Sequence, residues 1–263
     1  MTAATLQQKE IDMSTLYDAA FYREQSAGSR QSAQQVVPLL LQAFAPRSVV
    51  DLGCGIGTWL SVVRELGVED VLGLDGDYVD RSNLQIPGEQ FIPADFRKAV
   101  PTARQFDMAM CLEVAEHLPE DTAQGLITHL TKLAPLVAFS AAIPGQGGTD
   151  HVNERWQDYW RAGFLAQGYR AVDLIRPQVW QNDKVDFWYA QNLIVYASAE
   201  AISLHALTPV EPHISLNLVH PRQLTAARDE GRLYLSKALS MLPELLGKTV
   251  RRRLGLNSTP QGA

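Results

Sequence analysis

The chain has 263 residues, of which 46% are hydrophobic and 20% are charged, a composition typical of a globular protein with a buried core. It has no apolar run of about 18 residues and no basic start followed by an apolar stretch, which argues against a membrane span and a secretory signal. The net charge of −6 divides into −11 for residues 1–220 and +5 for residues 221–263, and an acidic main body disfavours a nucleic-acid substrate.

The cysteine content indicates a reducing compartment. Cys54 and Cys111 are the two cysteines, and neither belongs to a CxxC pair of the kind used for structural zinc or redox chemistry. Both lie near the ends of apolar runs, where a small buried residue fits. We therefore expect a cytoplasmic protein with reduced cysteines.

Short apolar runs alternate with helical patterns from residue 47 onward. Helices are predicted for residues 58–66, 121–133 and 154–166, where apolar residues recur with helical period. This alternation predicts an α/β protein with a Rossmann-like, doubly wound and mainly parallel sheet that has helices on both faces and binds its ligand at the carboxyl ends of the strands; the family resemblance described below implies that the sheet is mixed. Seven strands are predicted, at residues 48–52, 70–74, 90–93, 106–112, 136–142, 171–175 and 190–197.

The chain divides into three predicted parts. Residues 1–46 form a lead-in of mixed helix and loop, residues 47–198 form the α/β domain, and residues 199–263 form a linker and a basic, amphipathic, helical C-terminal extension. Three prolines between residues 208 and 221 indicate the linker. Three roles stay open for the basic extension: contact with an anionic membrane surface, docking on the acidic body or on a second subunit of a homo-oligomer, and a solvated tail.

A glycine-rich loop follows the first predicted strand. Residues 49–58 read VVDLGCGIGT, with Asp51 at the strand end and Gly53, Gly55 and Gly57 before a helix. Glycines let a ligand approach the backbone closely, and the helix N-terminus offers free N–H groups to an anionic group. The spacing is G-x-G-x-G, one residue shorter than the dinucleotide fingerprint.

Acidic residues at the ends of the next two strands complete a nucleoside site. Asp75 lies 22 residues after Gly53 and is suited to accept hydrogen bonds from both hydroxyls of a ribose. Asp95 and Phe96 follow the third strand, where a carboxylate and a ring suit an adenine.

The motifs VVDLGCGIGTWL, GLDGD and FDMAMCLEV, together with Asp95, resemble the class I methyltransferases that use S-adenosylmethionine (SAM). The resemblance covers about residues 47–197 and implies a seven-stranded sheet whose last strand is antiparallel. It implies that the glycines of the loop line the methionine part of SAM, Asp75 the ribose, and Asp95 with Phe96 the adenine. The full predicted cofactor set is Asp51, Gly53, Gly55, Gly57, Asp75, Gly76, Asp95, Phe96 and Leu112.

A second group of polar residues follows the fourth and fifth strands. Glu113, Glu116 and His117 have offsets that place them on one face of a helical turn, and His151 follows the fifth strand. Mixed oxygen and nitrogen ligands suit a divalent metal such as Mg²⁺ or Mn²⁺. The E-x-x-E-H pattern with a later D-H resembles the metal site of small-RNA 2′-O-methyltransferases, which implies an ion that grips two neighbouring hydroxyls. Without a metal, His117 or His151 is the candidate general base, and Glu113 shapes the pocket or accepts a proton.

The acceptor is predicted only by class. Residues 150–197 resemble methyltransferases of bacterial glycan and natural-product assembly, which implies O-methylation of a saccharide, glycolipid or natural product. The aromatic residues in this stretch suit either core packing or a wall for a ring-shaped acceptor. The alternatives are metal-free N- or C-methylation of a small metabolite, a SAM-binding scaffold without activity, and a nicotinamide-dependent reductase.

Overall fold

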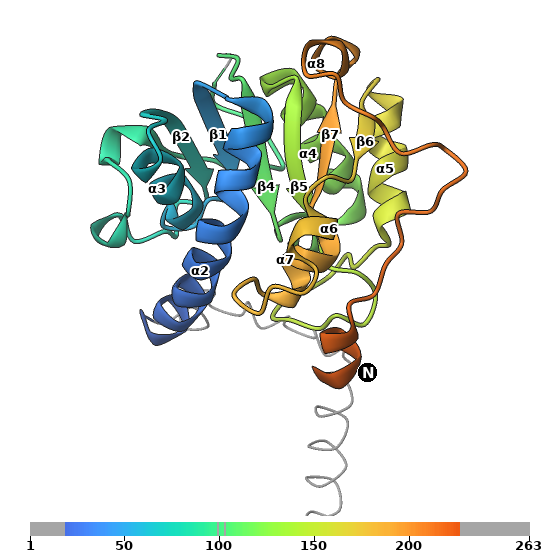
Figure 1. The fold of residues 1–263 in the computed structure, drawn as a ribbon. Coiled ribbons are helices and arrows are strands. Elements are labelled where there is room, and N and C mark those ends of the chain that lie inside the picture. Colours follow the sequence, from blue (N-terminus) through green and yellow to red (C-terminus); the bar gives the residue numbers. More distant parts are fainter. Residues whose placement is uncertain (1–18, 99, 103, 227–263) are drawn as a thin grey trace, which may run out of the picture. The chain divides into compact units, whose positions relative to one another are not determined.

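The computed structural model describes residues 19–98, 100–102 and 104–226, and its centre is the predicted seven-stranded mixed sheet (Figure 1). The strands are β1 (Ser48–Leu52), β2 (Asp70–Asp75), β3 (Phe91–Pro93), β4 (Met108–Leu112), β5 (Leu136–Ser140), β6 (Arg170–Val172) and β7 (Ile194–Ala197). They lie in the order β3-β2-β1-β4-β5-β7-β6, and β7 runs antiparallel to both of its neighbours. The fold class predicted from the alternating pattern is therefore confirmed.

Helices cover both faces of this sheet (Figure 1). One face packs on α2, α3, α6 and α7, with Val36, Leu40 and Leu60 among the fully buried side chains. The other face packs on α4 and α5, where Leu126 and Phe164 are fully buried. The helices are α2 (Ala19–Phe44), α3 (Thr58–Glu65), α4 (Glu120–Leu133), α5 (Gln157–Ala166), α6 (Arg176–Val179), α7 (Phe187–Asn192) and α8 (Ala199–Leu204), with 3-10 turns η1 (Arg81–Asn83), η2 (Gly88–Gln90) and η3 (Ala115–His117).

The strand order reverses between β1 and β4. From β1 the chain continues to β2 and β3 on one side, and then returns to β4 and β5 on the other side. Val50 in the middle of β1 pairs with Leu72 of β2 and with Ala109 of β4. Loops that leave neighbouring strands in opposite directions open a crevice at the carboxyl ends, which is where ligands bind in such sheets.

One stretch differs from its predicted structure. Residues 190–197 were expected to form one strand, but residues 187–192 form α7 and only Ile194–Ala197 is extended. Every residue from 189 to 197 is buried, so the run has no alternation that separates a buried helix from a strand.

The described part of the predicted lead-in consists mainly of one helix, α2, which continues through Pro38. Residues 1–18 of the lead-in lie outside the described residues.

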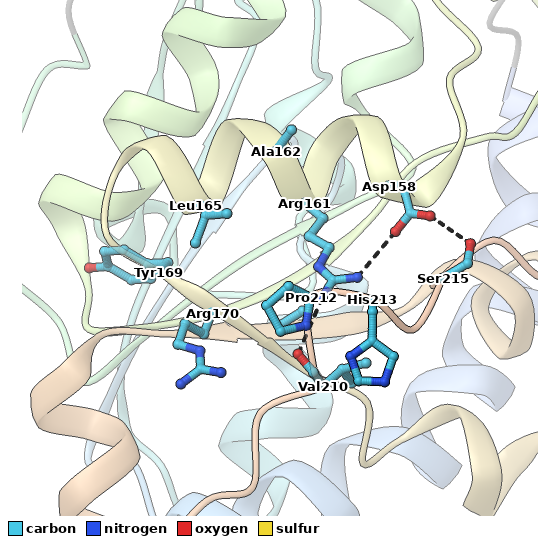
Figure 2. A pocket seen from close by; sticks show the side chains of 11 residues that line it. Asp158, Arg161, Ala162, Leu165, Tyr169, Arg170, Val210, Pro212, His213 and Ser215 are labelled. Carbon is cyan, nitrogen blue, oxygen red and sulfur yellow. Dashed lines mark hydrogen bonds and ion pairs between the residues drawn. The ribbon is translucent and has the colours of Figure 1, made fainter.

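A linker was expected at residues 208–221; residues 207–220 have no regular secondary structure but are hydrogen-bonded to α5 (Figure 2). The guanidinium of Arg161 donates to the backbone carbonyls of Val210, Glu211 and Ile214 at 2.7–3.2 Å. Asp158 accepts from the Ser215 hydroxyl at 2.6 Å. A cavity of about 350 Å³ remains between α5 and this segment, but none of the predicted site residues lines it.

The chain divides into compact units at residues 1–220 and 221–263. Of the second unit the structure describes residues 221–226, which are helical, so the predicted basic extension lies almost wholly outside the described residues. The predicted domain boundaries stay predictions. Within the described residues, no helix combines the length and the apolar character needed to cross a membrane.

The glycines of the fold give a matched test of backbone strain. Gly57 has φ +83°, and a Cβ there would lie 2.9 Å from Cγ1 of Ile86, whereas a Cβ on Gly125 in α4 would meet open space. We expect Gly57→Ala to lower the free energy of unfolding by about 1–3 kcal/mol, and Gly125→Ala to raise it by about 0.5–1 kcal/mol. Urea denaturation of both variants measures the difference, and equal effects at the two positions would contradict the assignment.

Candidate active site

A cavity of about 680 Å³ lies at the carboxyl ends of the strands around the β1–β4 reversal. This volume is within the usual range for a small-molecule site. Asp51, Gly57, Leu112, Glu116 and His151 do not line it. The predicted site residues that do line it are Gly53, Gly55, Asp75, Gly76, Asp95, Phe96, Glu113 and His117.

The glycine-rich loop turns sharply at the cavity wall. Gly53 and Gly55 have φ of +83° and +55°, a region that L side chains rarely adopt. A Cβ on Gly53 would lie 2.3 Å from Val114, whereas a Cβ on Gly55 would project into open space. Packing therefore requires glycine at position 53, whereas the open space beside Gly55 is compatible with the predicted close approach of a ligand. Gly57 packs against Ile86, so its requirement for glycine is structural.

Asp75 organises the middle of the cavity. Its carboxylate accepts hydrogen bonds from the backbone N–H of Gly55, the backbone N–H of Gly76 and the hydroxyl of Tyr78, each at 2.6 Å. Burial raises the pKa of Asp75, and the three donors oppose that rise by stabilising the charged form. The Tyr78 hydroxyl thus donates to this carboxylate from a position that would also suit a ribose hydroxyl of a nucleoside ligand.

Asp51 lies behind the cavity wall, not on it. Its side chain is 3% exposed. Burial, and then the charge of Asp75, raise the pKa of Asp51 to about 7. The predicted direct contact between Asp51 and the cofactor is therefore not supported, because Asp51 does not line the cavity.

Asp95 and Phe96 form another wall of the cavity. Asp95 accepts from Nε and Nη2 of Arg97 at 2.8 and 3.0 Å, and these hydrogen bonds hold the pKa of the Asp95 carboxyl well below its usual range. Phe96 is buried, and its ring borders the cavity. The predicted pairing of a carboxylate with an aromatic ring is therefore present, and Asp95 keeps its negative charge.

Glu113 leaves β4 in a strained conformation. Its φ is +55°, and its backbone N–H donates to the carbonyl of Ser140. The carboxylate accepts from the amides of Gln146 at 2.8 Å and Asn192 at 3.2 Å. A bridge from Gln191 to Gln146 at 3.1 Å extends this network into α7. Non-glycine residues with positive φ often mark functional sites, where the surrounding structure holds the strain.

The predicted arrangement of Glu113 on the same helical face as Glu116 and His117 is wrong. Residues 115–117 form the 3-10 turn η3, and Glu113 precedes this turn with left-handed backbone. The amide network holds the Glu113 carboxylate, and the group of possible metal ligands in the described residues contains Glu116, His117 and His151 instead.

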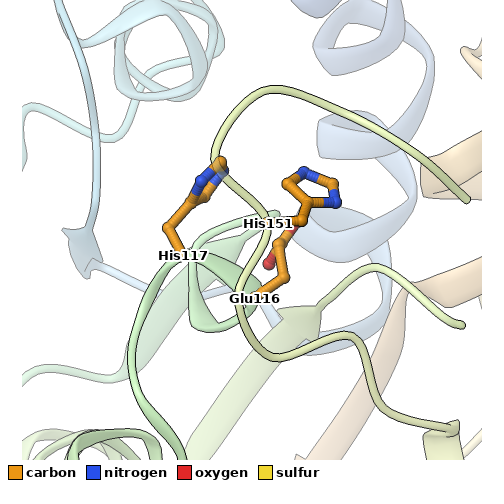
Figure 3. A group of neighbouring side chains, drawn as sticks. All are labelled: Glu116, His117 and His151. Carbon is orange, nitrogen blue, oxygen red and sulfur yellow. The ribbon is translucent and has the colours of Figure 1, made fainter. Parts of the chain in front are cut away.

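The ligand atoms of Glu116, His117 and His151 all lie within 4.8 Å of one another (Figure 3). We call these three residues the EHH cluster. Figure 3 shows the two imidazole rings on either side of a gap, and their planes are nearly perpendicular with centroids 4.9 Å apart. His117 also lines the cavity, and so does Asp150, the neighbour of His151. The EHH cluster therefore adjoins the end of the cavity.

Glu116 is the most unusual member of the EHH cluster. It is fully buried, and among the described residues neither of its carboxylate oxygens has a hydrogen bond of normal geometry. Burial and the nearby Glu113 carboxylate raise the pKa of Glu116 well above its usual value. A buried carboxylate without donors is costly unless a proton or a cation accompanies it. Together with two imidazoles, it fits the mixed ligand set of a divalent metal.

His117 is suited to act as a neutral imidazole. Burial, and then the proximity of His151, lower the pKa of His117. A neutral imidazole has a free lone pair, which is the form needed both by a metal ligand and by a general base. The arrangement therefore supports either of the two roles predicted from the sequence.

Three of the aromatic residues expected near the acceptor belong to the core. Trp160 and Phe164 are fully buried against Phe139 of β5, and Tyr189 is 7% exposed. Trp156 is 41% exposed. Core packing, one of the two readings of the aromatic pattern, therefore accounts for the three buried rings.

Several residues at the site had not been singled out from the sequence for a role. Tyr78 lies three residues after Asp75 in GLDGDY, and its spacing alone gave no reason to place its hydroxyl on that carboxylate. Gln146 and Gln191 emerge as partners of Glu113 and Asn192 only in the structure, because the predicted strand at residues 190–197 would have pointed neighbouring side chains to opposite faces.

The chain matches the model of a known protein family. A family model described as a methyltransferase domain matches residues 22–168, more than half of the chain. No match to the chain is found among curated proteins.

Solved structures resemble the chain at the level of the fold. An O-methyltransferase family protein from Burkholderia thailandensis aligns with a TM-score of 0.50 and 14% identity, over 70% of this chain and 62% of that protein. This chain therefore spans less than two thirds of that protein's length. A SAM-dependent methyltransferase from Archaeoglobus fulgidus has a TM-score of 0.46 and 19% identity, over 59% and 77% of the two chains. Magnesium protoporphyrin IX methyltransferase from Synechocystis PCC 6803, with bound S-adenosylhomocysteine (SAH), has a TM-score of 0.46 and 18% identity, over 68% of this chain and 88% of that protein.

Asp75 gives a direct test of the cavity. If its carboxylate holds the ribose of the cofactor, Asp75→Ala removes two charge-assisted hydrogen bonds, which corresponds to a loss of SAH affinity of about 100-fold or more. Asp75→Asn keeps the volume of the side chain and guards against misfolding. Calorimetric titration with SAH measures the effect, and Asp80→Asn, which changes a residue outside the cavity lining, serves as the control. Equal SAH affinity in wild type and Asp75→Ala would remove Asp75 from the cofactor site.

The buried Asp51 carboxyl should make the free energy of unfolding depend on pH. Its pKa rises from 3.8 to about 7 on folding, so the folded protein binds this proton more tightly than the unfolded chain does. Its stabilising contribution is therefore complete below pH 4 and is lost as the pH rises towards 7. Between pH 4 and pH 8, the free energy of unfolding of Asp51→Asn should therefore rise relative to that of wild type, by at most on the order of 4 kcal/mol. Urea denaturation at several pH values gives the two curves, and parallel curves would contradict a buried, proton-binding Asp51.

Proposed function

This chain belongs to the class I SAM-dependent methyltransferases, and on that premise we propose that it methylates a hydroxyl oxygen of a saccharide, glycolipid or other polyhydroxylated natural product. The observation that carries the proposal is the position of the EHH cluster beside the cofactor cavity, because His117 belongs to both. A hydroxyl must lose its proton to become a good nucleophile, and this cluster supplies groups that take or replace a proton.

The cavity residues hold the methyl donor in this proposal. Gly55 leaves room beside the backbone for the methionine part, and Gly53 lines the cavity next to it. Asp75 accepts from the ribose, and Asp95 with Phe96 binds the adenine. The cavity lining carries several carboxylates, which suit the positive charge of a sulfonium. Because the sulfonium is already activated, proximity and orientation supply much of the rate enhancement.

The EHH cluster would hold a divalent ion such as Mg²⁺ or Mn²⁺. The fit rests on the unpartnered, buried Glu116 carboxylate and the two adjoining imidazoles. A bound cation would lower the pKa of an acceptor hydroxyl and orient its oxygen. Glu113 stands next to this cluster as a polar wall, since its own carboxylate is held by Gln146 and Asn192.

The metal-free variant of the same reaction uses His117 or His151 as the general base. The lowered pKa of His117 keeps its imidazole neutral and able to accept a proton near pH 7. In both variants the acceptor hydroxyl lies between the methyl donor and the EHH cluster. We also propose a cytoplasmic location, which the unpaired, buried Cys54 and Cys111 support.

Metal removal separates the two variants. With a polyhydroxylated acceptor, we expect EDTA treatment to lower SAH formation by about 100-fold or more, with recovery on adding Mn²⁺ or Mg²⁺. Glu116→Gln should have the same effect as EDTA, because it removes the charge but keeps the size of the buried side chain. Glu120→Gln, which changes an exposed carboxylate bound to Arg155, is the matched control and should retain activity.

Two results would revise the proposal in different ways. Activity untouched by EDTA but lost in His151→Ala would leave the general-base variant and exclude the metal. Full activity in His117→Ala, His151→Ala and Glu116→Gln would exclude the EHH cluster from the reaction and favour N- or C-methylation.

A further inference from the structure

The carboxylate of Glu154 lies behind His151 and joins it to the loop after β5. Its Oε1 atom lies 3.0 Å from Nδ1 of His151 and accepts the backbone N–H of Gly147 at 3.0 Å. Its Oε2 atom accepts the backbone N–H of Gly145 at 2.7 Å. The side chains of Glu154 and His151 are only 21% and 12% exposed. Two backbone N–H donors and Nδ1 of His151 therefore converge on one shielded carboxylate that the proposed reaction does not use.

The loop itself is built to place the His151 ring. Gly145, Gly147 and Gly148 all have positive φ, and a Cβ on Gly148 would lie 2.3 Å from Nε2 of His151. The ring therefore packs directly on the Gly148 backbone. On the other side, the backbone N–H groups of residues 152 and 153 both donate to the carbonyl of Glu116, at 2.9 and 3.0 Å. His151 is held between Glu154, Gly148 and the turn that carries the EHH cluster.

The chemistry of the Glu154 contact selects one form of the imidazole. An ionised carboxylate only accepts hydrogen bonds, so the nitrogen next to it, Nδ1, must carry a hydrogen. In a neutral imidazole the free lone pair is then on Nε2. Outer carboxylates that fix the tautomer and orientation of a histidine are a common feature of metal sites and of catalytic histidines.

We propose that Glu154 is a positioning residue that fixes His151 as the Nδ1–H tautomer, so that Nε2 is the atom that serves the EHH cluster. This inference rests on the proposed function, in which His151 either binds a metal or takes a proton. It holds for both variants, because each needs a free lone pair on a nitrogen of known position. Glu154 does not line the cofactor cavity, so its effect is confined to His151 and its loop.

The test measures the tautomer directly, without any turnover. We would label the full chain with ¹⁵N-histidine, free of metal and cofactor, and assign His151 by comparison with His151→Gln. In wild type, NMR should show hydrogen on Nδ1 and a free Nε2. In Glu154→Ala, the hydrogen should move to Nε2 in a large part of the molecules. Glu154→Gln should retain the Nδ1–H form, because its amide oxygen still accepts a hydrogen bond.

The second readout separates positioning from a general effect on folding. Glu154→Ala should lower kcat, and any affinity for Mn²⁺, by about 10–100-fold, while the KM for SAM stays unchanged. Glu154→Gln should recover part of kcat, and Glu120→Gln should match wild type in both readouts. Thermal unfolding of each variant confirms that the compared proteins are folded.

An unchanged His151 tautomer in Glu154→Ala would overturn the inference, and so would wild-type kcat in that variant. Failure of the proposed function has a different signature, because His151→Ala would then keep full activity. The tautomer of the resting protein does not depend on that result.

Discussion

The hydrogen bond from the Gly55 N–H to the Asp75 carboxylate joins the loop after β1 to the end of β2, and the cavity depends on it. The loop reaches Asp75 only because Gly53 and Gly55 adopt positive φ, and the loop is further fixed by the Gly53 N–H on the carbonyl of Leu74. Burial makes the Asp75 charge unfavourable, and its three donors offset that cost. In the proposed binding mode, the ribose hydroxyls of SAM would meet a carboxylate whose position is already set, so little ordering would remain to oppose binding.

The EHH cluster, which adjoins the end of the cavity, contains a buried carboxylate whose electrostatic environment differs from that of Asp75. Glu116 is as buried as Asp75, but among the described residues neither of its carboxylate oxygens has a hydrogen bond of normal geometry. A fold retains such a group most readily where a proton or a cation completes it, because an unpaired buried charge costs several kcal/mol. The neighbouring Glu113 shows the contrast, because two amides hold its carboxylate. Two adjacent glutamates thus have different environments, which is a common way to give similar groups different roles.

Hydrogen bonds at the cavity wall join segments that are distant in the sequence. The amide network joins Glu113 at the end of β4 to Gln146 after β5 and to Asn192 at the end of α7. Gln191 also accepts the backbone N–H of His220, so residues 207–220 are fastened to the same network that holds Glu113. Hydrogen-bonded amides therefore connect residues 207–220 to the Glu113 carboxylate.

The sequence alone determined the features that depend on local backbone rules. Short apolar runs predicted the strands, and the G-x-G-x-G loop and Asp75 at the end of β2 predicted parts of the cavity lining, because strand ends and tight turns follow from neighbouring residues. Only the tertiary structure decided which distant side chains meet. It gave Glu113 a left-handed backbone outside the turn that carries Glu116, formed α7 where a strand was expected, and brought Glu154 behind His151. These contacts depend on how loops pack over the sheet edge, and helical or strand periodicity carries no information about that packing.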